Sequence, residues 1–472
     1  MSLHAMWDAL RAPIPQEKKD LLADRWSSLE PALRTDFQGF GQQSTGCGAV
    51  LGAFPRCDFD CRGCYLGADA NAVKPFDRQE IFRQLDALRR HLGPKGNVQI
   101  TDGEVTLLPI KVLLAILRYA RDIGLIPMLM THGDSFRRKP DLLTRLVAEG
   151  GLTEVSIHVD TTQQGRRGEW NPQRESDLHP LRDEFAALIR RVRRETGVRL
   201  RAATTMTVTS ENLDGVESVV SWCLENRDAF GLISFQPLAP VGRTREELVG
   251  VKVAELWERV GAALAEHGVD TSVRTPAWFG HPDCTRMETL LVLDRPGRSP
   301  VAAPMLRPGE ERDRAIAERY LELGFGGVVF RDDSLSVRLA RGAGMFLRAP
   351  GWFFGPFRRW MAARTREFGT TLPRLVFQLL RGRARLDGFS VASHHFMGAE
   401  EMATAKGQER LEACVFRLPV EDRMVPMCQI NAGDLRDRLY DRGWAVGKVA
   451  TAEERPRLPV VDAVREPASA SL

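Results

Sequence analysis

The chain has 472 residues, of which 43% are hydrophobic and 27% charged, and its net charge is only +4. This composition excludes collagen-like, low-complexity and wholly disordered proteins, and the balanced charge excludes a protein that binds polyanions over its whole surface. At about 150 residues per domain, the length allows two or three structural units. Eight cysteines are too few for a disulfide scaffold in a chain this long, but they suffice for metal sites.

The N-terminal residues contain no basic segment followed by an apolar core, so we expect no signal peptide. No apolar run reaches the ~18 residues that a membrane-spanning helix needs. We therefore expect a cytoplasmic protein, because a reducing compartment keeps thiols free or bound to metal.

After a helical lead-in over residues 1–45, strand-like and helix-like stretches alternate across 46–270. Apolar or β-branched runs predict strands at 49–54, 97–101, 126–131, 154–160, 199–209 and 232–238. Amphipathic stretches predict helices at 77–93, 108–123, 139–149, 180–196 and 213–227. This alternation is typical of an α/β fold with a parallel sheet, either a partial or full barrel or an open doubly wound sheet.

The remaining chain divides by composition. Residues 271–337 are expected to be loop and linker carrying Cys284, because 295–312 is rich in Pro and Arg. Residues 338–386 contain eleven Arg, no Lys, eight aromatics and a single acidic residue, Glu367. Residues 387–450 predict a compact cysteine-bearing module, and 451–472 predict a disordered tail.

Cys57, Cys61 and Cys64 follow the first predicted strand in the spacing C-x3-C-x2-C. A loop after a strand lies at the carboxyl edge of the sheet, where α/β folds build their sites. Three thiolates suit three irons of a [4Fe–4S] cluster and leave the fourth iron open to an external ligand. A zinc knuckle or an inert trio is the alternative, but structural zinc takes four ligands and no second C-x2-C occurs.

This motif, after the first strand of a βα repeat, resembles the radical S-adenosylmethionine (SAM) superfamily. The resemblance implies a partial (βα)6 barrel, SAM bound to the open iron, and reductive cleavage of SAM to a 5′-deoxyadenosyl radical. Asp102-Gly103-Glu104 resembles the superfamily's Gly-Gly-Glu motif, with Asp102 in place of the first glycine. Backbone carbonyls and Glu104 would then hold the SAM ammonium, since both are acceptors. Gly63 departs from the apolar residue common before the last cysteine, and Tyr65 is expected to supply that contact.

Polar residues also end the later predicted strands. They are His132 and Asp134 after the third, His158 and Asp160 after the fourth, and Gln236 in the sixth. Because barrel strands end at one rim, we expect these residues to contact SAM. The alternative that each only caps the following helix stays open, above all for Asp134.

Four of the remaining cysteines, Cys47, Cys284, Cys414 and Cys428, lie in loops or beside a hairpin-like stretch. They make up one complete Cys₄ set, which predicts an auxiliary [4Fe–4S] cluster with His281 as a substitute ligand. Four unrelated thiols remain the alternative. Cys223 lies on an apolar helical face and is expected to be a buried, inert thiol.

A closer resemblance rests on short patches between residues 47 and 431. Cys47 lies ten residues before Cys57, GHPDC spans 280–284, HHFM spans 394–397 and MCQIN spans 427–431. They resemble the radical SAM branch that contains the archaeal tetraether lipid synthase and a methanogen pterin methylase. The resemblance implies a C-terminal auxiliary iron–sulfur module and chemistry on unactivated carbon.

The arginine and aromatic residues of 338–386 predict a segment that contacts a membrane or a lipid substrate. A surface lid packed on the barrel is the alternative, and a nucleic-acid patch is less favoured. We therefore expect a radical SAM enzyme, cytoplasmic or peripheral on the inner membrane face, that attacks a C–H bond of a lipid or long-chain substrate. The outcome would be C–C bond formation, methylation or a related modification, with flavodoxin or ferredoxin as electron donor. The alternatives are a peptide- or tRNA-modifying enzyme and a structural iron–sulfur or zinc protein.

Overall fold

A computed structural model of the chain describes residues 7, 10, 14–166, 168, 171–269, 277–307, 310–323 and 335–441. The predicted tail at 451–472 and the end of the predicted module, from residue 442, lie outside the described residues. Parts of the predicted linker, at 271–276, 308–309 and 324–334, also lie outside them.

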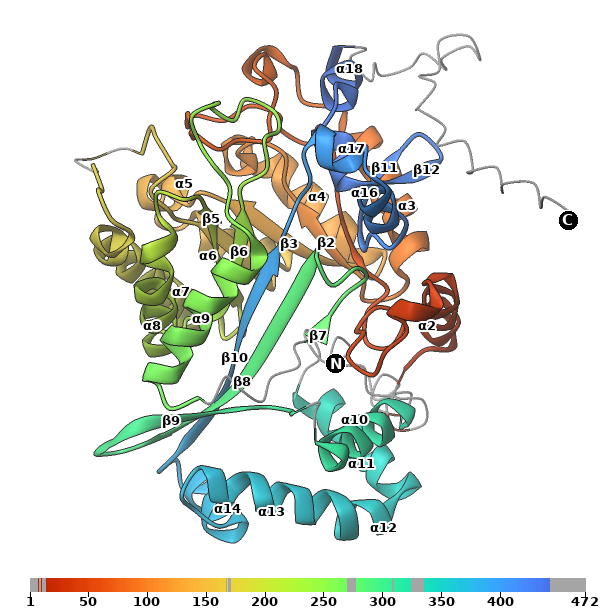
Figure 1. Cartoon of the computed structure of the whole chain (residues 1–472), viewed down its shortest axis with the longest axis vertical. Helices are drawn as coiled ribbons and strands as arrows, with labels where there is room; N and C mark the ends of the chain where they lie inside the picture. Colours follow the sequence, from red (N-terminus) through yellow and green to blue (C-terminus); the bar gives the residue numbers. More distant parts are fainter. Residues whose placement is uncertain are drawn as a thin grey trace, which may run out of the picture.

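Six parallel strands form the centre of the fold, in the order β1-β2-β3-β4-β5-β6 (Figure 1). They are β1 Cys47–Ala49, β2 Asn97–Ile100, β3 Ile126–Thr131, β4 Glu154–His158, β5 Arg201–Val208 and β6 Phe230–Pro237. The helices between and after them are α3 Arg78–Leu92, α4 Ile110–Asp122, α5 Asp134–Arg138, α6 Leu142–Gly150, α7 His179–Thr196, α8 Val216–Glu225 and α9 Val253–Glu266. The predicted partial (βα)6 barrel is thereby confirmed.

Helix α3 illustrates how the sequence forms these units. Asp77 accepts a hydrogen bond from the Gln79 amide and caps the helix at its start. Ile81, Leu85 and Leu88 recur at helical spacing and are almost wholly buried against the sheet. The same apolar core continues through the other helices and contains Cys223, which is fully buried on α8 as predicted.

The C-terminal region does not form a separate module. Strand β10 Arg385–His394 pairs in parallel with β6, and β11 Phe416–Val420 pairs in parallel with β1, so this region extends both edges of the half-barrel. Strand β12 Arg423–Pro426 forms the expected hairpin with β11. The connecting and terminal helices are α15 Ala399–Met402, α16 Ala405–Glu412, α17 Met427–Asn431 and α18 Leu435–Asp441.

The linker expected at 295–312 is instead largely a hairpin. Strand β8 Thr285–Arg295 pairs antiparallel with β10 and with β9 Arg298–Pro304, and the two-residue strand β7 Ala277–Trp278 joins its other end. Strand β9 pairs only with β8, so its free edge tolerates the prolines that suggested a loop.

Further helices complete the described chain. Helix α2 Gln16–Ser28 forms the N-terminal lead-in. At the amino end of β10 lie α10 Glu311–Glu322, α11 Leu335–Arg348, α12 Pro350–Trp352, a π turn at Phe353–Phe357, α13 Arg358–Glu367 and α14 Leu372–Leu380 (Figure 1, lower end). Trp360 Nε1 donates to Asp313 Oδ1 (2.7 Å), which ties α13 to α10. None of the helices in the described ranges is long and apolar enough to cross a membrane.

Candidate functional site

The three motif cysteines line a cavity of about 200 Å³ at the carboxyl edge of the six central strands. The loop that carries them leaves β1 at Ala49, earlier than predicted, because Gly52 adopts a φ of +75°. The cavity wall also contains Tyr65, Asp102, Gly103, Glu104, His132, His158 and Gln236. The structure thus brings most of the predicted site residues to one cavity, whereas Asp134 and Asp160 do not line it; contact of these residues with SAM stays a prediction.

The motif thiols lie close enough to influence one another. Burial raises the pKa of Cys57 to about 12, and the neighbouring Cys64 contributes to the rise. Burial also raises the pKa of Cys61 strongly, with Cys64 and Cys57 adding to it. Such thiols ionise readily only when a cation replaces the proton, as happens on metal binding.

The spacing of the thiols fits a cluster better than a single ion. Zinc–sulfur bonds of about 2.3 Å would place tetrahedral thiolates within about 4 Å of one another. Among the described residues, the only trio of potential ligand atoms within 4.8 Å is Cys57, Asp58 and His132, not the three cysteines. The three cysteine sulfurs are thus not all close enough together to bind one zinc ion, whereas the [4Fe–4S] cluster that their spacing predicts accepts wider separations.

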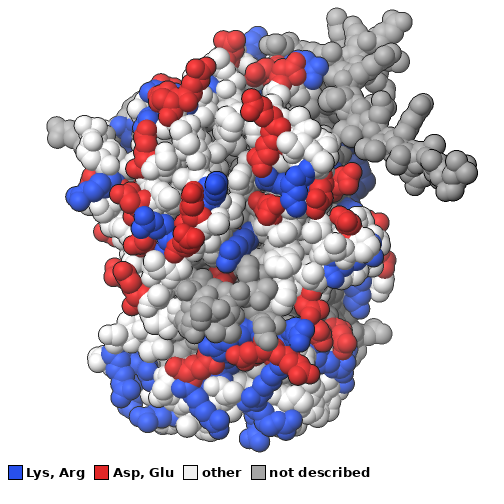
Figure 2. Space-filling model, viewed as in Figure 1, with Lys and Arg blue, Asp and Glu red and all other residues white. Residues whose placement is uncertain are grey.

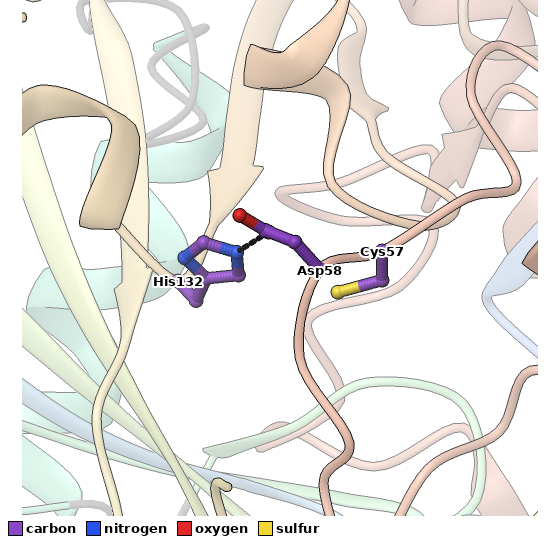
Figure 3. A group of neighbouring side chains, drawn as sticks. All are labelled: Cys57, Asp58 and His132. Atoms are coloured by element: carbon purple, nitrogen blue, oxygen red, sulfur yellow. Dashed lines mark hydrogen bonds and ion pairs between the residues drawn. The ribbon is translucent and has the colours of Figure 1, made fainter. Parts of the chain in front are cut away.

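Asp58 and His132 fasten the cysteine loop to the end of β3 (Figure 3). The Asp134 amide donates to His132 Nδ1 (3.1 Å), so Nε2 carries the hydrogen and donates to Asp58 Oδ1 at 2.9 Å. The ring of Phe59 stacks on His132 with centroids 3.7 Å apart. Because both nitrogens of His132 are occupied, this trio holds the loop in place and does not form an open metal site.

Glu104 is buried and its carboxylate already accepts hydrogen bonds from the protein. Oε1 accepts from the Thr106 amide (3.1 Å) and Thr131 Oγ1 (2.8 Å), and Oε2 accepts from the His132 amide (2.9 Å). A carboxylate has about four acceptor positions, so few remain for a SAM ammonium. A direct contact between Glu104 and SAM stays a prediction, and the geometry favours a role in joining β2 to β3.

Asp102 and Gly103 form the turn that follows β2 and lies against the cysteine loop. Asp102 has a φ of +134°, in the region that favours glycine, which agrees with the glycine of the resembling motif at this position. Its carboxylate faces Arg436 and Tyr440 on α18 and accepts from the Gly52 amide at 2.6 Å. A Cβ at Gly103 would lie 2.2 Å from the Arg56 carbonyl oxygen, so only glycine fits against the cysteine loop.

Tyr65 lies against this turn and is half-buried. Its hydroxyl donates to the Asp102 carbonyl, and the Arg436 guanidinium lies 4.9 Å from the centre of its ring. Burial is the main cause that raises the pKa of Tyr65 well above its usual range. Tyr65 therefore connects the cysteine motif to the Asp102 turn, and it also lines the cavity as expected for a SAM contact.

His158 and Asp160 form a pair at the end of β4. His158 Nε2 lies 2.5 Å from Asp160 Oδ2, which also accepts from the Thr207 amide at 2.6 Å. Burial alone would raise the pKa of Asp160, but His158, Thr162 and Thr207 lower it to about 2. Asp160 thus orients His158, whereas Asp134 faces Arg137 (3.1 Å) away from the cavity.

The cavity also has an apolar lining that was not predicted. It contains Leu238 and Val241 after β6, and Phe396, Phe416 and Met427 from the C-terminal region. Thr205 and Thr207 also line the cavity. Because residues i and i+2 of a strand face the same side, the sequence could have predicted that both face the site. The sequence could not assign the C-terminal residues to the cavity, because no local pattern shows that β10 and β11 join the barrel.

The auxiliary cysteines gather where β1, β8, β11 and α17 meet. Burial raises the pKa of Cys284 to about 11 and of Cys428 to about 12, and the Cys414 thiol contributes to both rises. Arg410 Nε donates to Cys284 Sγ at 3.2 Å, which favours a thiolate. Cys47 begins β1 opposite Phe416, two residues after Cys414.

His281 does not offer a free nitrogen beside these cysteines. Its Nε2 lies 3.1 Å from Glu409 Oε1, and its Nδ1 accepts from the Asp283 amide at 3.1 Å. The geometry thus brings Cys284, Cys414 and Cys428 together more clearly than it supports His281 as a ligand.

Comparison with known families bears on this region of the chain. Residues 53–223 match the family model described as "Radical SAM superfamily". This stretch is a radical SAM domain. It contains the cysteine motif, the Asp102 turn and the ends of β2–β5, and it indicates an enzyme of that superfamily. The [4Fe–4S] cluster and SAM are the cofactors that the family implies, and the donor set described above fits them.

Some solved structures match this chain over about half of each chain's length. SuiB from Streptococcus suis matches at 14% identity and a TM-score of 0.35, covering 48% of this chain and 47% of SuiB. The anSMEcpe structure with bound AdoMet matches at 13% identity and a TM-score of 0.30, covering 40% and 50%. No curated protein matches the chain significantly. None of these findings supports the tetraether lipid synthase branch in particular.

Proposed function

We propose that this chain binds a [4Fe–4S] cluster and SAM in the cavity and uses them to abstract a hydrogen atom from an unactivated C–H bond. The observation that carries the proposal is that Cys57, Cys61 and Cys64 line the same cavity as the Asp102-Gly103-Glu104 turn. When bound, the cluster supplies one electron that cleaves SAM to methionine and a 5′-deoxyadenosyl radical, which removes the substrate hydrogen.

The residues of the chain would divide this work between them. The three cysteines hold three irons, and the backbone of the Asp102 turn and Tyr65 shape the space beside the open iron. His158, oriented by Asp160, offers its second ring nitrogen to a polar group of SAM or substrate.

The apolar lining supports a long-chain or lipid-like substrate. Leu238, Val241, Phe396 and Met427 present hydrocarbon to the cavity that the cysteines also line. An alkyl chain gains free energy from such a surface, whereas a charged substrate would lose hydration there. Comparing lipid extracts from cells with and without the gene would test this substrate class, and identical lipid profiles would remove its support.

We also propose an auxiliary [4Fe–4S] cluster held by Cys284, Cys414 and Cys428, with Cys47 as the fourth ligand. The mutual influence of three of these thiols and the Arg410 guanidinium support a shared anionic site. Such a cluster, placed beside the apolar lining of the cavity, would pass an electron to or from a substrate radical.

Anaerobic reconstitution tests both clusters. We expect about seven to eight irons per wild-type chain, and about three to four after Cys57, Cys61 and Cys64 are replaced by Ala or, separately, after Cys414 and Cys428 are replaced. The first variant should form no 5′-deoxyadenosine from SAM with dithionite, whereas Cys223→Ala should behave as wild type. Wild-type protein that binds iron but never cleaves SAM would contradict the proposed function.

A further inference from the structure

Helices α13 and α14 form a groove of about 620 Å³ on the surface of the molecule. Arg358, Ala362 and Arg366 recur every four residues along α13, so they form one stripe on that side of the groove. Leu372, Val376 and Leu380 recur with the same spacing along α14 and form the other side. One wall of the groove is therefore cationic and the other aliphatic.

The apolar side chains of this surface are unusually exposed. Leu380 is 83% exposed, Phe377 50% and Val376 45%. Phe354, in the π turn before α13, is 67% exposed. A contiguous exposed apolar surface normally marks a site of contact with another molecule.

Among the described residues, no carboxylate pairs with Arg358, Arg366 or Arg381. Glu367 is the only acidic residue within 338–386. Its carboxylate already pairs with Arg307 and Arg364, each at 2.7 Å, and not with the exposed arginines of the groove. Figure 2 shows Lys and Arg side chains gathered along the lowest edge of the molecule, over α12–α14, below a band of Asp and Glu side chains. Arg381 lies with its guanidinium 4.9 Å from the centre of the Phe377 ring, so charge and apolar surface meet directly.

Among possible partners, an anionic bilayer fits this combination best. Phosphate groups match the arginines, and acyl chains match Val376 and Leu380. Nucleic acid would also match the arginines, and Phe354 and Phe377 could stack on bases, but the exposed Val376 and Leu380 would gain nothing from such a partner. A protein partner would need acidic and apolar groups side by side on one surface. An anionic bilayer presents phosphates beside acyl chains everywhere along its interface.

We propose that the α13–α14 surface docks this enzyme peripherally on a bilayer that contains anionic phospholipids. Phe354, Val376, Phe377 and Leu380 enter the boundary between headgroups and acyl chains, while Arg358, Arg366 and Arg381 contact phosphates. The surface lies outside the cavity, so this inference does not depend on SAM chemistry and can fail or hold separately from it.

Co-sedimentation of the full chain with vesicles tests the proposal. We expect binding to vesicles of phosphatidylcholine mixed with phosphatidylglycerol, little binding to phosphatidylcholine alone, and weaker binding as salt rises. Phe377→Glu combined with Leu380→Glu should weaken binding by about tenfold or more. Arg358→Gln and Arg366→Gln should each weaken it by about fivefold.

Matched controls lie elsewhere on the surface. Val249→Glu changes an apolar side chain that is 60% exposed, and Arg423→Gln removes an exposed arginine, so neither should alter vesicle binding. Unchanged melting temperature and iron content would show that the variants fold. Equal binding to both vesicle types, binding insensitive to all α13–α14 variants, or a dimer in solution that these variants dissociate would each overturn the proposal.

Discussion

Arg436 joins the C-terminal helix α18 to the edge of the candidate SAM site through one buried carboxylate. It pairs with Asp102, while both Asn431 Oδ1 (2.7 Å) and Tyr440 hold the guanidinium in place. The side chains of the pair are 3% and 1% exposed. Asp102, which stands where the resembling motif has a glycine, thus binds helix α18 to the turn after β2.

Removing Arg436 should therefore damage both stability and SAM binding. Arg436→Met leaves the Asp102 carboxylate buried without its partner, and we expect a loss of about 3–5 kcal/mol in the free energy of unfolding. Chemical denaturation and SAM affinity of the reconstituted protein would measure the two effects. The double variant Asp102→Gly with Arg436→Met should recover most of the loss, and failure to recover would show that Arg436 acts mainly through Tyr65 or Tyr440.

His91 should make stability depend on pH. Burial, together with Arg25 and Arg417, lowers the pKa of His91 to about 4. Between pH 6.5 and 4, His91 is therefore protonated in the unfolded chain but neutral in the folded chain. The free energy of unfolding falls as the pH drops through this window. We expect His91→Gln to reduce that fall by about 2 kcal/mol. Parallel pH profiles of unfolding for the two proteins would contradict this assignment.

At the scale of elements, the sequence predicted what local patterns encode. Periodicity predicted the six βα units, and the cysteine motif and the polar ends of the strands predicted residues that the structure brings to one cavity. The sequence could not predict that β10 and β11 extend the barrel, because pairing between strands that are far apart in sequence leaves no local pattern. Pro300 and Pro304 suggested a loop because proline is rare in central strands, but β9 is an edge strand.

The contact between the β2 turn and the cysteine loop gives an element-scale prediction. Gly103→Ala would place a Cβ 2.2 Å from the Arg56 carbonyl oxygen and force the two loops apart. We expect a loss of about 1–3 kcal/mol in stability and reduced iron incorporation at the motif cysteines. Gly342→Ala on α11, where nothing lies within 4 Å of the new Cβ, is the control and should incorporate iron normally.

At the scale of the whole molecule, β10 separates the proposed docking surface from the cavity. Its amino end follows α14 and its carboxyl end reaches the rim of the barrel (Figure 1). Ten residues at about 3.3 Å each place these ends about 30 Å apart. A docked enzyme would therefore hold its cavity away from the bilayer, and a lipid substrate would have to leave the membrane plane to react.

This arrangement predicts that docking leaves the cavity accessible. We expect the rate of 5′-deoxyadenosine formation from SAM to change less than about twofold when anionic vesicles bind most of the protein, since small molecules still reach the barrel rim. Timed assays with and without vesicles would measure it. Strong inhibition by anionic vesicles, absent in the Phe377→Glu and Leu380→Glu variant, would instead place the cavity against the bilayer.

The order in which the ribosome makes the strands has a consequence for biogenesis. Strands β1 and β6 emerge well before their outer neighbours β11 and β10. About 150 residues separate β6 from β10, which at about 5–20 residues per second leaves one edge unpaired for about ten seconds or more. Unpaired strand edges recruit other chains. The nascent protein should therefore be a strong chaperone client until its final strands are complete, and early termination there should yield aggregates.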